Sequence, residues 1–150
     1  MEGMVIFPCQ DGGTDDYAGR MRSISNMLRC LGRDNFKFDF VPYGCHCTRK
    51  KRRILIGKPV DLIDWCCLQH QCCYKTRVGE GCNPMVHYRW SCIDGIVACP
   101  SRPKTHLCHT ARCTCDYYLA LCLLPFPVWE KYKNHPLKHC SKDIQCFFTT

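Results

Sequence analysis

Seventeen of the 150 residues are cysteine, about 11%, which exceeds the roughly 8–10% that marks a disulfide-built scaffold. Because glutathione keeps cytosolic thiols reduced, this composition indicates a secreted chain and excludes an ordinary cytosolic enzyme. No stretch approaches the roughly 20 apolar residues of a membrane span, and a net charge of +8 favours anionic partners, such as lipid headgroups or sulfated glycans.

The chain is predicted to consist of a flexible extension, residues 1–19, and one domain, residues 20–150. The extension contains Gly12-Gly13, Asp15-Asp16 and little periodicity. A secreted chain normally opens with a basic segment and an apolar segment of roughly 7–15 residues. Because residues 1–9 are too short and too acidic to be one, we expect that a signal peptide has been removed or that the natural start differs.

Three helices and one hairpin are predicted in the domain. Apolar residues recur at helical spacing over 21–31, and the second and third helices are expected at 59–78 and at about 105–124. Between them, Asp94-Gly95 predicts the turn of a β-hairpin. The fold class is therefore mainly α.

The spacing of cysteines relates the second and third helices. Cys66 and Cys73 lie seven residues apart, on one face of their helix, and Cys115 and Cys122 repeat this spacing. If the helices are antiparallel, Cys66 can meet Cys122 while Cys73 meets Cys115. Spacing alone leaves this pairing an inference.

The same register brings His70 close to Asp116. A histidine held against a carboxylate is typical of a general-base pair. A lone histidine on a helix face is more often structural, so the functional interpretation depends on the partner that the register supplies.

A zinc site is an alternative use of some cysteines. It would use C-x-C pairs and a neighbouring histidine, although structural zinc more often uses C-x₂₋₄-C pairs and would leave most cysteines unexplained. The candidate ligands are Cys45, His46, Cys47, Cys113, Cys115, His139 and Cys140.

Three sequence blocks follow one another in a recognisable order. They are Tyr43-Gly44-Cys45-His46-Cys47, then Cys66-Cys67-Leu68-Gln69-His70-Gln71-Cys72-Cys73-Tyr74, then Cys113-Thr114-Cys115-Asp116. Over residues 21–146 the chain resembles the secretory phospholipase A2 family, and residues 63–67 and 81–84 look closest to the group X enzymes and the otoconin branch. The resemblance implies a disulfide-rich fold with two long antiparallel helices, an N-terminal helix and a small β-wing.

The resemblance also implies eight disulfides and leaves Cys9 without a partner. An odd cysteine in a secreted protein suggests a free thiol or an intermolecular bridge. The implied pairs are Cys30–Cys92, Cys45–Cys140, Cys47–Cys67, Cys66–Cys122, Cys72–Cys146, Cys73–Cys115, Cys82–Cys108 and Cys99–Cys113.

The family's reaction assigns roles to three residues. A histidine takes a proton from a water molecule, which attacks the ester at the second position of a glycerophospholipid. By resemblance His70 is this base, Asp116 orients it and Tyr74 supports the pair.

The family's second requirement is a calcium ion, and here the chain departs from the pattern. Calcium is bound by backbone carbonyls of a glycine-rich loop, matching His46, Thr48 and Lys50, and by an aspartate, matching Gln71. Gln71 brings no negative charge, whereas calcium prefers carboxylates. Because Thr48 and Lys50 replace glycines, the carbonyls lose the freedom to turn inward. We expect a degenerate site that does not bind calcium normally.

A run of five basic residues follows this loop position. Three interpretations of this run are a solvated loop, a site for phospholipid membranes or sulfated glycans, and a nuclear signal. A gene-model error that displaced a true calcium loop is a further one. The run comprises Arg49, Lys50, Lys51, Arg52 and Arg53.

These observations favour a secreted phospholipase A2 homologue that binds phospholipid or other anionic surfaces, with weak hydrolysis or none. The alternatives are an active calcium-dependent phospholipase A2 and an otoconin-like matrix protein. The charge of +8 argues against the matrix protein, because mineral-binding surfaces are usually acidic. No nucleic-acid partner is expected.

Overall fold

The computed structural model describes residues 5–7, 17–33, 42–47, 57–78, 88–99, 107–126 and 130–140. None of the helices in these ranges is long and apolar enough to cross a membrane. In chain order the elements are β1 (Val5–Phe7), α1 (Tyr17–Cys30), α2 (Leu62–Cys73), the π-helix η1 (Tyr74–Val78), β2 (Trp90–Ile93), β3 (Ile96–Ala98), α3 (Leu107–Leu123) and the 3-10 helix η2 (Leu137–His139).

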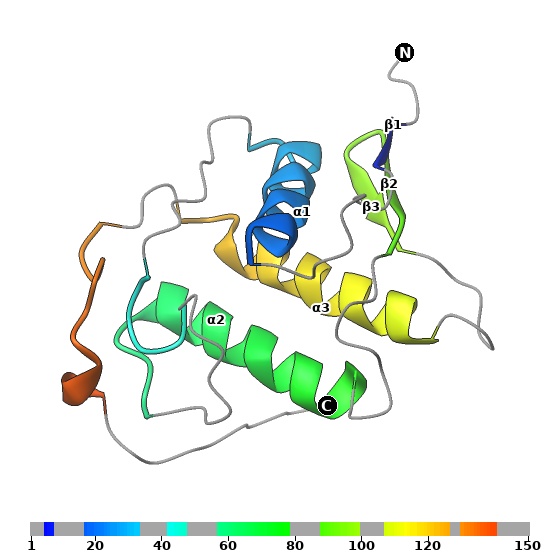
Figure 1. The fold of residues 1–150 in the computed structure, drawn as a ribbon. Helices are drawn as coiled ribbons and strands as arrows, with labels where there is room; N and C mark the ends of the chain where they lie inside the picture. The colour runs from blue at the N-terminus through cyan, green and yellow to red at the C-terminus, as the bar shows by residue number, and fades with distance from the viewer. Residues whose placement is uncertain are drawn as a thin grey trace.

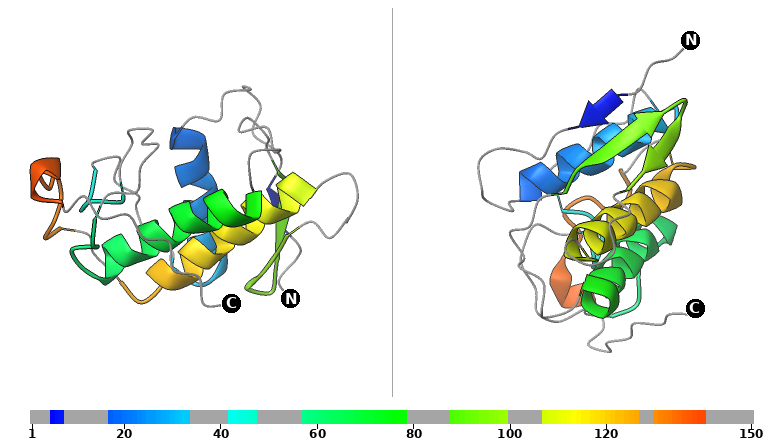
Figure 2. Two further views of the ribbon diagram at one scale, coloured as in Figure 1. Left: turned by 90° about the horizontal axis from the view of Figure 1, so that it is seen from below. Right: turned by 90° about the vertical axis from the view of Figure 1, so that its right-hand side faces the viewer.

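The elements stack in layers around α3. Helices α2 and α3 lie side by side and antiparallel, α1 crosses α3 on its other side, and the small sheet lies beside α1 near the N-terminal end of α3 (Figures 1 and 2). Because α3 is covered on two sides, its residues Leu119, Ala120 and Leu123 are almost completely buried. Ile24 and Met27 of α1 join the same core. The fold is mainly α, as the sequence predicts.

Two disulfides join α2 to α3 in the predicted register. Cys66 is bonded to Cys122 and Cys73 to Cys115, and in both bridges the Cα atoms lie 5.7 Å apart. Each bridge therefore fixes one point of the helix pair, two turns from the other. Together they prevent the helices from sliding or rotating past each other.

Six of the eight expected disulfides lie wholly within the described residues, and all six are confirmed. The other four of these are Cys30–Cys92, Cys45–Cys140, Cys47–Cys67 and Cys99–Cys113. Cys72 and Cys108 are also disulfide-bonded. Their expected partners Cys146 and Cys82 lie outside the described residues, as does Cys9.

The predicted hairpin is present, and the segment before the first helix joins it. Strands β2 and β3 are antiparallel around Asp94 and Gly95, whose φ values of 49° and 77° suit a tight hairpin turn. Strand β1 pairs antiparallel with β2, in the register Ile6 opposite Ser91. Val5–Phe7 therefore form a strand within the predicted extension, and α1 begins at Tyr17. The division of the chain at residue 19 stays a prediction.

Helix α2 begins later and ends earlier than its pattern predicts. Asp61 is its N-cap and accepts the backbone N–H of Asp64 at 2.9 Å, which satisfies one of the helix's first free donors. At its other end, Tyr74 begins the π-helical turn η1. In place of the predicted single helix over 59–78, the structure has a capped α-helix followed by a π-helical turn.

A buried carboxylate holds the turn at 42–47 against α2. Asp64 is inaccessible to solvent and accepts the backbone N–H groups of Cys45, His46 and Val60 at 2.9, 2.7 and 2.9 Å. These donors replace the water that a buried carboxylate loses. Gly44 packs on the carboxylate so closely that an added Cβ would lie 2.4 Å from Asp64 Cγ, at a φ of +60°.

Replacing Gly44 with alanine should therefore destabilise the protein by more than the usual cost of alanine at positive φ. The matched control is Gly95→Ala, where φ is +77° and the nearest atom to the new Cβ is 3.6 Å away. Overpacking adds about 1–3 kcal/mol, so denaturant unfolding should show this difference between the variants. Equal free energies of unfolding would contradict the contact between Gly44 and Asp64.

Candidate active site

The residues predicted as a general-base pair lie in contact. His70 Nε2 is 2.6 Å from Asp116 Oδ1, and Asp116 is fully buried while the His70 side chain is 12% exposed. Because a carboxylate only accepts, Nε2 carries the proton and Nδ1 is left as the basic nitrogen of the ring. The pair owes its position to the disulfide-fixed register of α2 and α3.

Two tyrosine hydroxyls complete the surroundings of Asp116. Tyr74 donates to Oδ1 at 2.8 Å, as its predicted supporting role requires, and Tyr88 donates to Oδ2. Sequence reasoning missed Tyr88, which stands outside every motif. The bridge between Cys99 and Cys113, which ties the hairpin to α3, is the signal that brings the hairpin's residues near the pair.

Burial sets the protonation of both tyrosines. Loss of solvent, followed by the nearby charge of Asp116, raises the pKa of Tyr74 and of Tyr88 well above the usual range. Both hydroxyls therefore stay protonated and remain donors at every physiological pH. The buried guanidinium of Arg112, 5.2 Å from the centre of the Tyr74 ring, acts in the opposite direction on the pKa of Tyr74; sequence reasoning missed this residue too.

Two residues predicted for the degenerate calcium site contact each other directly. The side-chain amide of Gln71 donates from Nε2 to the backbone carbonyl of His46. At the position of Gln71 the described part of the site therefore offers an amide in place of the carboxylate that calcium prefers among its six to eight oxygen ligands. Thr48 and Lys50 lie outside the described residues.

Residues on the two sides of the basic run 49–53 contact each other, although the run itself lies outside the described residues. The ring of His46 is buried and its Nε2 lies 2.8 Å from the carbonyl oxygen of Gly57. His46 and Gly57 flank the stretch 48–56, which contains the five basic residues. The described residues on the two sides of this stretch are therefore in contact with each other.

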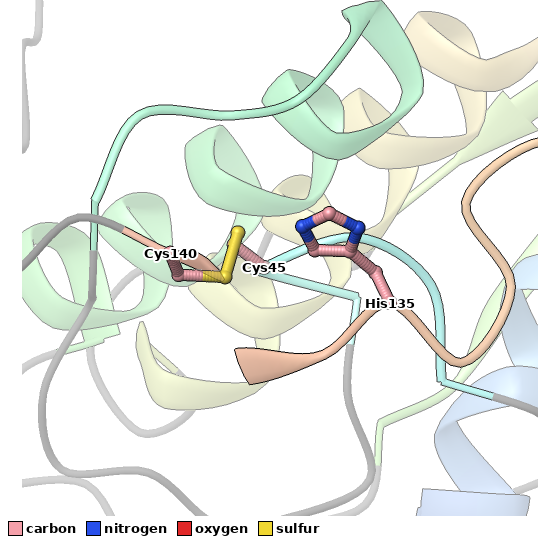
Figure 3. A group of neighbouring side chains, drawn as sticks. All are labelled: Cys45, His135 and Cys140. Carbon is pink, nitrogen blue, oxygen red and sulfur yellow. A yellow bond between two sulfur atoms is a disulfide. The ribbon is translucent and has the colours of Figure 1, made fainter. Parts of the chain in front are cut away.

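The zinc interpretation is wrong for the cysteines that the structure describes. The ligand atoms of Cys45, His135 and Cys140 lie within 4.8 Å of one another, but Figure 3 shows the two sulfurs joined in a disulfide beside the His135 ring. A metal needs the thiolate form, which a disulfide does not offer. The other candidate cysteines, Cys47, Cys113 and Cys115, are also in disulfides.

Comparison with known proteins agrees with the motifs. The model of the family described as phospholipase A2 matches residues 21–135. The group 10 secretory phospholipase A2 of Rattus norvegicus is 34% identical over 85% of this chain and 80% of its own length. The group IIF enzyme of Mus musculus is 34% identical over 79% and 69%, and the group IID enzyme of Homo sapiens 39% over 81% and 77%.

The raised pKa values of Tyr74 and Tyr88 predict a loss of stability in alkali. In the unfolded chain both would titrate at about 10, so the unfolded state binds fewer protons above that pH and stability falls as pH rises. Ultraviolet titration of tyrosinate should show a late phase coincident with unfolding. Tyr88→Phe should reduce this phase and lower the free energy of unfolding by about 1–3 kcal/mol, whereas Tyr118→Phe, at a half-exposed position, should change neither. A late phase unchanged in Tyr88→Phe would contradict the assignment.

Proposed function

This chain belongs to the secretory phospholipase A2 family, and we propose that it is a secreted homologue that binds phospholipid or other anionic surfaces with little or no hydrolysis. The observation that carries the proposal is the hydrogen bond from the Gln71 side chain to the His46 carbonyl. It joins two groups that family-type chemistry requires as separate calcium ligands.

The general-base half of the chemistry is supported by the geometry. With Nε2 bonded to Asp116, His70 can accept a proton from water on Nδ1, and the buried carboxylate would stabilise the imidazolium that forms. Tyr74 and Tyr88 hold the carboxylate in place. Water could therefore be activated at this site.

The contacts of the described residues do not support the second half of the chemistry, which is stabilisation of the negative charge that forms on the ester. Attack on an ester places negative charge on the carbonyl oxygen, and in this family a calcium ion stabilises that charge and holds the substrate phosphate. Gln71 supplies no negative charge at this position, and its side-chain amide is hydrogen-bonded to the His46 carbonyl. Loss of a single oxyanion-stabilising donor costs roughly 10²–10³ in rate, so an activated water alone would give little turnover.

The first test is hydrolysis of phospholipid vesicles with millimolar calcium and with EDTA. We expect the same background rate in both, and no shift of the midpoint of thermal unfolding on adding calcium, because a ligand that binds only the folded state would raise it. Calcium-dependent turnover at rates typical of the family would contradict the proposal.

The variant Gln71→Asp tests whether the side chain alone is responsible. Because Thr48 and Lys50 also replace the loop glycines, we expect Gln71→Asp to stay within about twofold of the background, since a normal site needs the loop carbonyls as well. Gln69→Asp adds the same charge on another face of α2 and is the matched control. Full rescue by Gln71→Asp would show that the loop is competent.

An active calcium-dependent phospholipase A2 is the second candidate function. The intact contacts of His70, Tyr74 and Tyr88 with Asp116 favour it, because that network serves proton transfer. The same hydrolysis assay distinguishes the two candidates.

The proposed binding to anionic surfaces has its own test. Each basic side chain near an anionic membrane contributes about 1 kcal/mol, so replacing Lys51, Arg52 and Arg53 with glutamine should weaken binding to anionic vesicles at least tenfold. The control replaces the exposed Lys75, Lys131 and Lys138 with glutamine and removes the same charge elsewhere. Sedimentation with vesicles at several salt concentrations measures both, and heparin competition tests the sulfated glycans. An equal loss in both variants would assign the binding to net charge and contradict a local site.

A further inference from the structure

A groove of about 510 Å³ runs between α2 and α3. The two interhelical disulfides form part of its lining, with Trp65 and Gln69 on the α2 side and Tyr118 and Leu119 on the α3 side. Its volume lies within the range of about 300–1,000 Å³ that is typical of sites for small ligands.

The groove lies on a different face of α2 from the degenerate calcium site. Its lining residues Cys66, His70 and Cys73 recur at spacings of three and four, so they share one face. Gln71 and Cys67 lie about a quarter turn or more away and contact the turn at 42–47. His70 belongs to both sides, because its ring lines the groove while its Nε2 contacts Asp116.

The walls of the groove carry large apolar side chains that water still reaches. Trp65 is 44% exposed and Tyr118 48% exposed, although tyrosine and tryptophan usually bury most of their surface. Contact with a hydrocarbon chain would remove this surface from water, which is favourable in proportion to the area buried.

Among the described residues that line the groove, Arg77 is the one arginine or lysine. Arg77, from η1, places its guanidinium 5.7 Å from the centre of the Tyr118 ring, and among the described residues no carboxylate forms an ion pair with it. None of the described residues that line the groove is acidic. An arginine in this position can accept a carboxylate with two parallel hydrogen bonds.

We propose that this groove binds the anion of a long-chain fatty acid, with the hydrocarbon chain along Trp65 and Tyr118 and the carboxylate at Arg77. The part of α2 from Trp65 to Cys73 spans about 12 Å along the axis, and Arg77 lies beyond it in η1, so an elongated ligand with one charged end matches the groove better than a compact anion. The proposal does not depend on hydrolysis or on calcium, because the contacts it uses are those of Trp65, Tyr118 and Arg77 and not those of Gln71 or the turn at 42–47.

The test is quenching of tryptophan fluorescence by stearate brominated at mid-chain, below its critical micelle concentration. The chain has three tryptophans, and Trp90 is buried in the core. We expect saturable quenching by the natural chain and loss of most of it in Trp65→Phe. Equilibrium dialysis with labelled oleate should show that Trp65→Phe still binds within about threefold, since the benzyl ring retains most of the apolar contact.

Arginine 77 is tested with a matched pair of variants. Arg77→Gln should weaken oleate binding about threefold to fivefold, because it removes an exposed ion pair, and the methyl ester of the acid should bind the natural chain as weakly. Lys75→Gln removes the same charge from the same exposed segment, outside the groove lining, and should leave the affinity unchanged. Circular dichroism checks that both variants fold.

Three results would overturn the proposal. Quenching that persists in Trp65→Phe would place the ligand elsewhere. Equal losses of affinity in Arg77→Gln and Lys75→Gln would show that the total charge of the protein, and not a contact between Arg77 and the carboxylate, affects binding. Quenching that appears only with vesicles, and not with monomeric fatty acid, would identify the face as a membrane contact.

Discussion

The covalent clamp between α2 and α3 is the constraint on which the rest of this structure depends. Two disulfides, separated by two helical turns, leave the helices one register. That register places His70 against Asp116 on the inner side of the pair and opens the groove beneath Trp65 and Tyr118 on the outer side. One covalent feature thus positions both the candidate catalytic pair and the candidate lipid site.

Two buried carboxylates organise the remainder, and each is satisfied by three donors. Asp116 accepts from His70, Tyr74 and Tyr88, while Asp64 accepts three backbone N–H groups at the turn and before α2. A buried charge without such partners would be strongly unfavourable. Asp64 holds the turn at 42–47 against α2 together with the Cys45–Cys140 and Cys47–Cys67 disulfides, so protein groups alone make these contacts.

The site therefore combines a preserved half with an altered half. The contacts that would orient His70 and stabilise its protonated form are all made, whereas the Gln71 side chain is hydrogen-bonded to the carbonyl it would join in binding calcium. The proposed function accounts for this combination, because it keeps the fold and the general-base pair while it reduces the assistance that a calcium ion would give. The strongly basic segment, closed at its base by His46 and Gly57, gives such a protein a means of meeting anionic surfaces.

By itself the sequence determined the disulfide-rich, mainly α fold and the meeting of His70 with Asp116. Periodicity and seven-residue cysteine spacing place residues on one face of a helix, and the disulfides between the helices then set the register in which the two residues meet. Only the tertiary structure decided that Tyr88 reaches Asp116 and that Gln71 donates to His46. It also decided that Val5–Phe7 pairs with β2. These contacts join segments whose relative positions no local pattern constrains, since they depend on how the turn, the hairpin and the helices pack around α3.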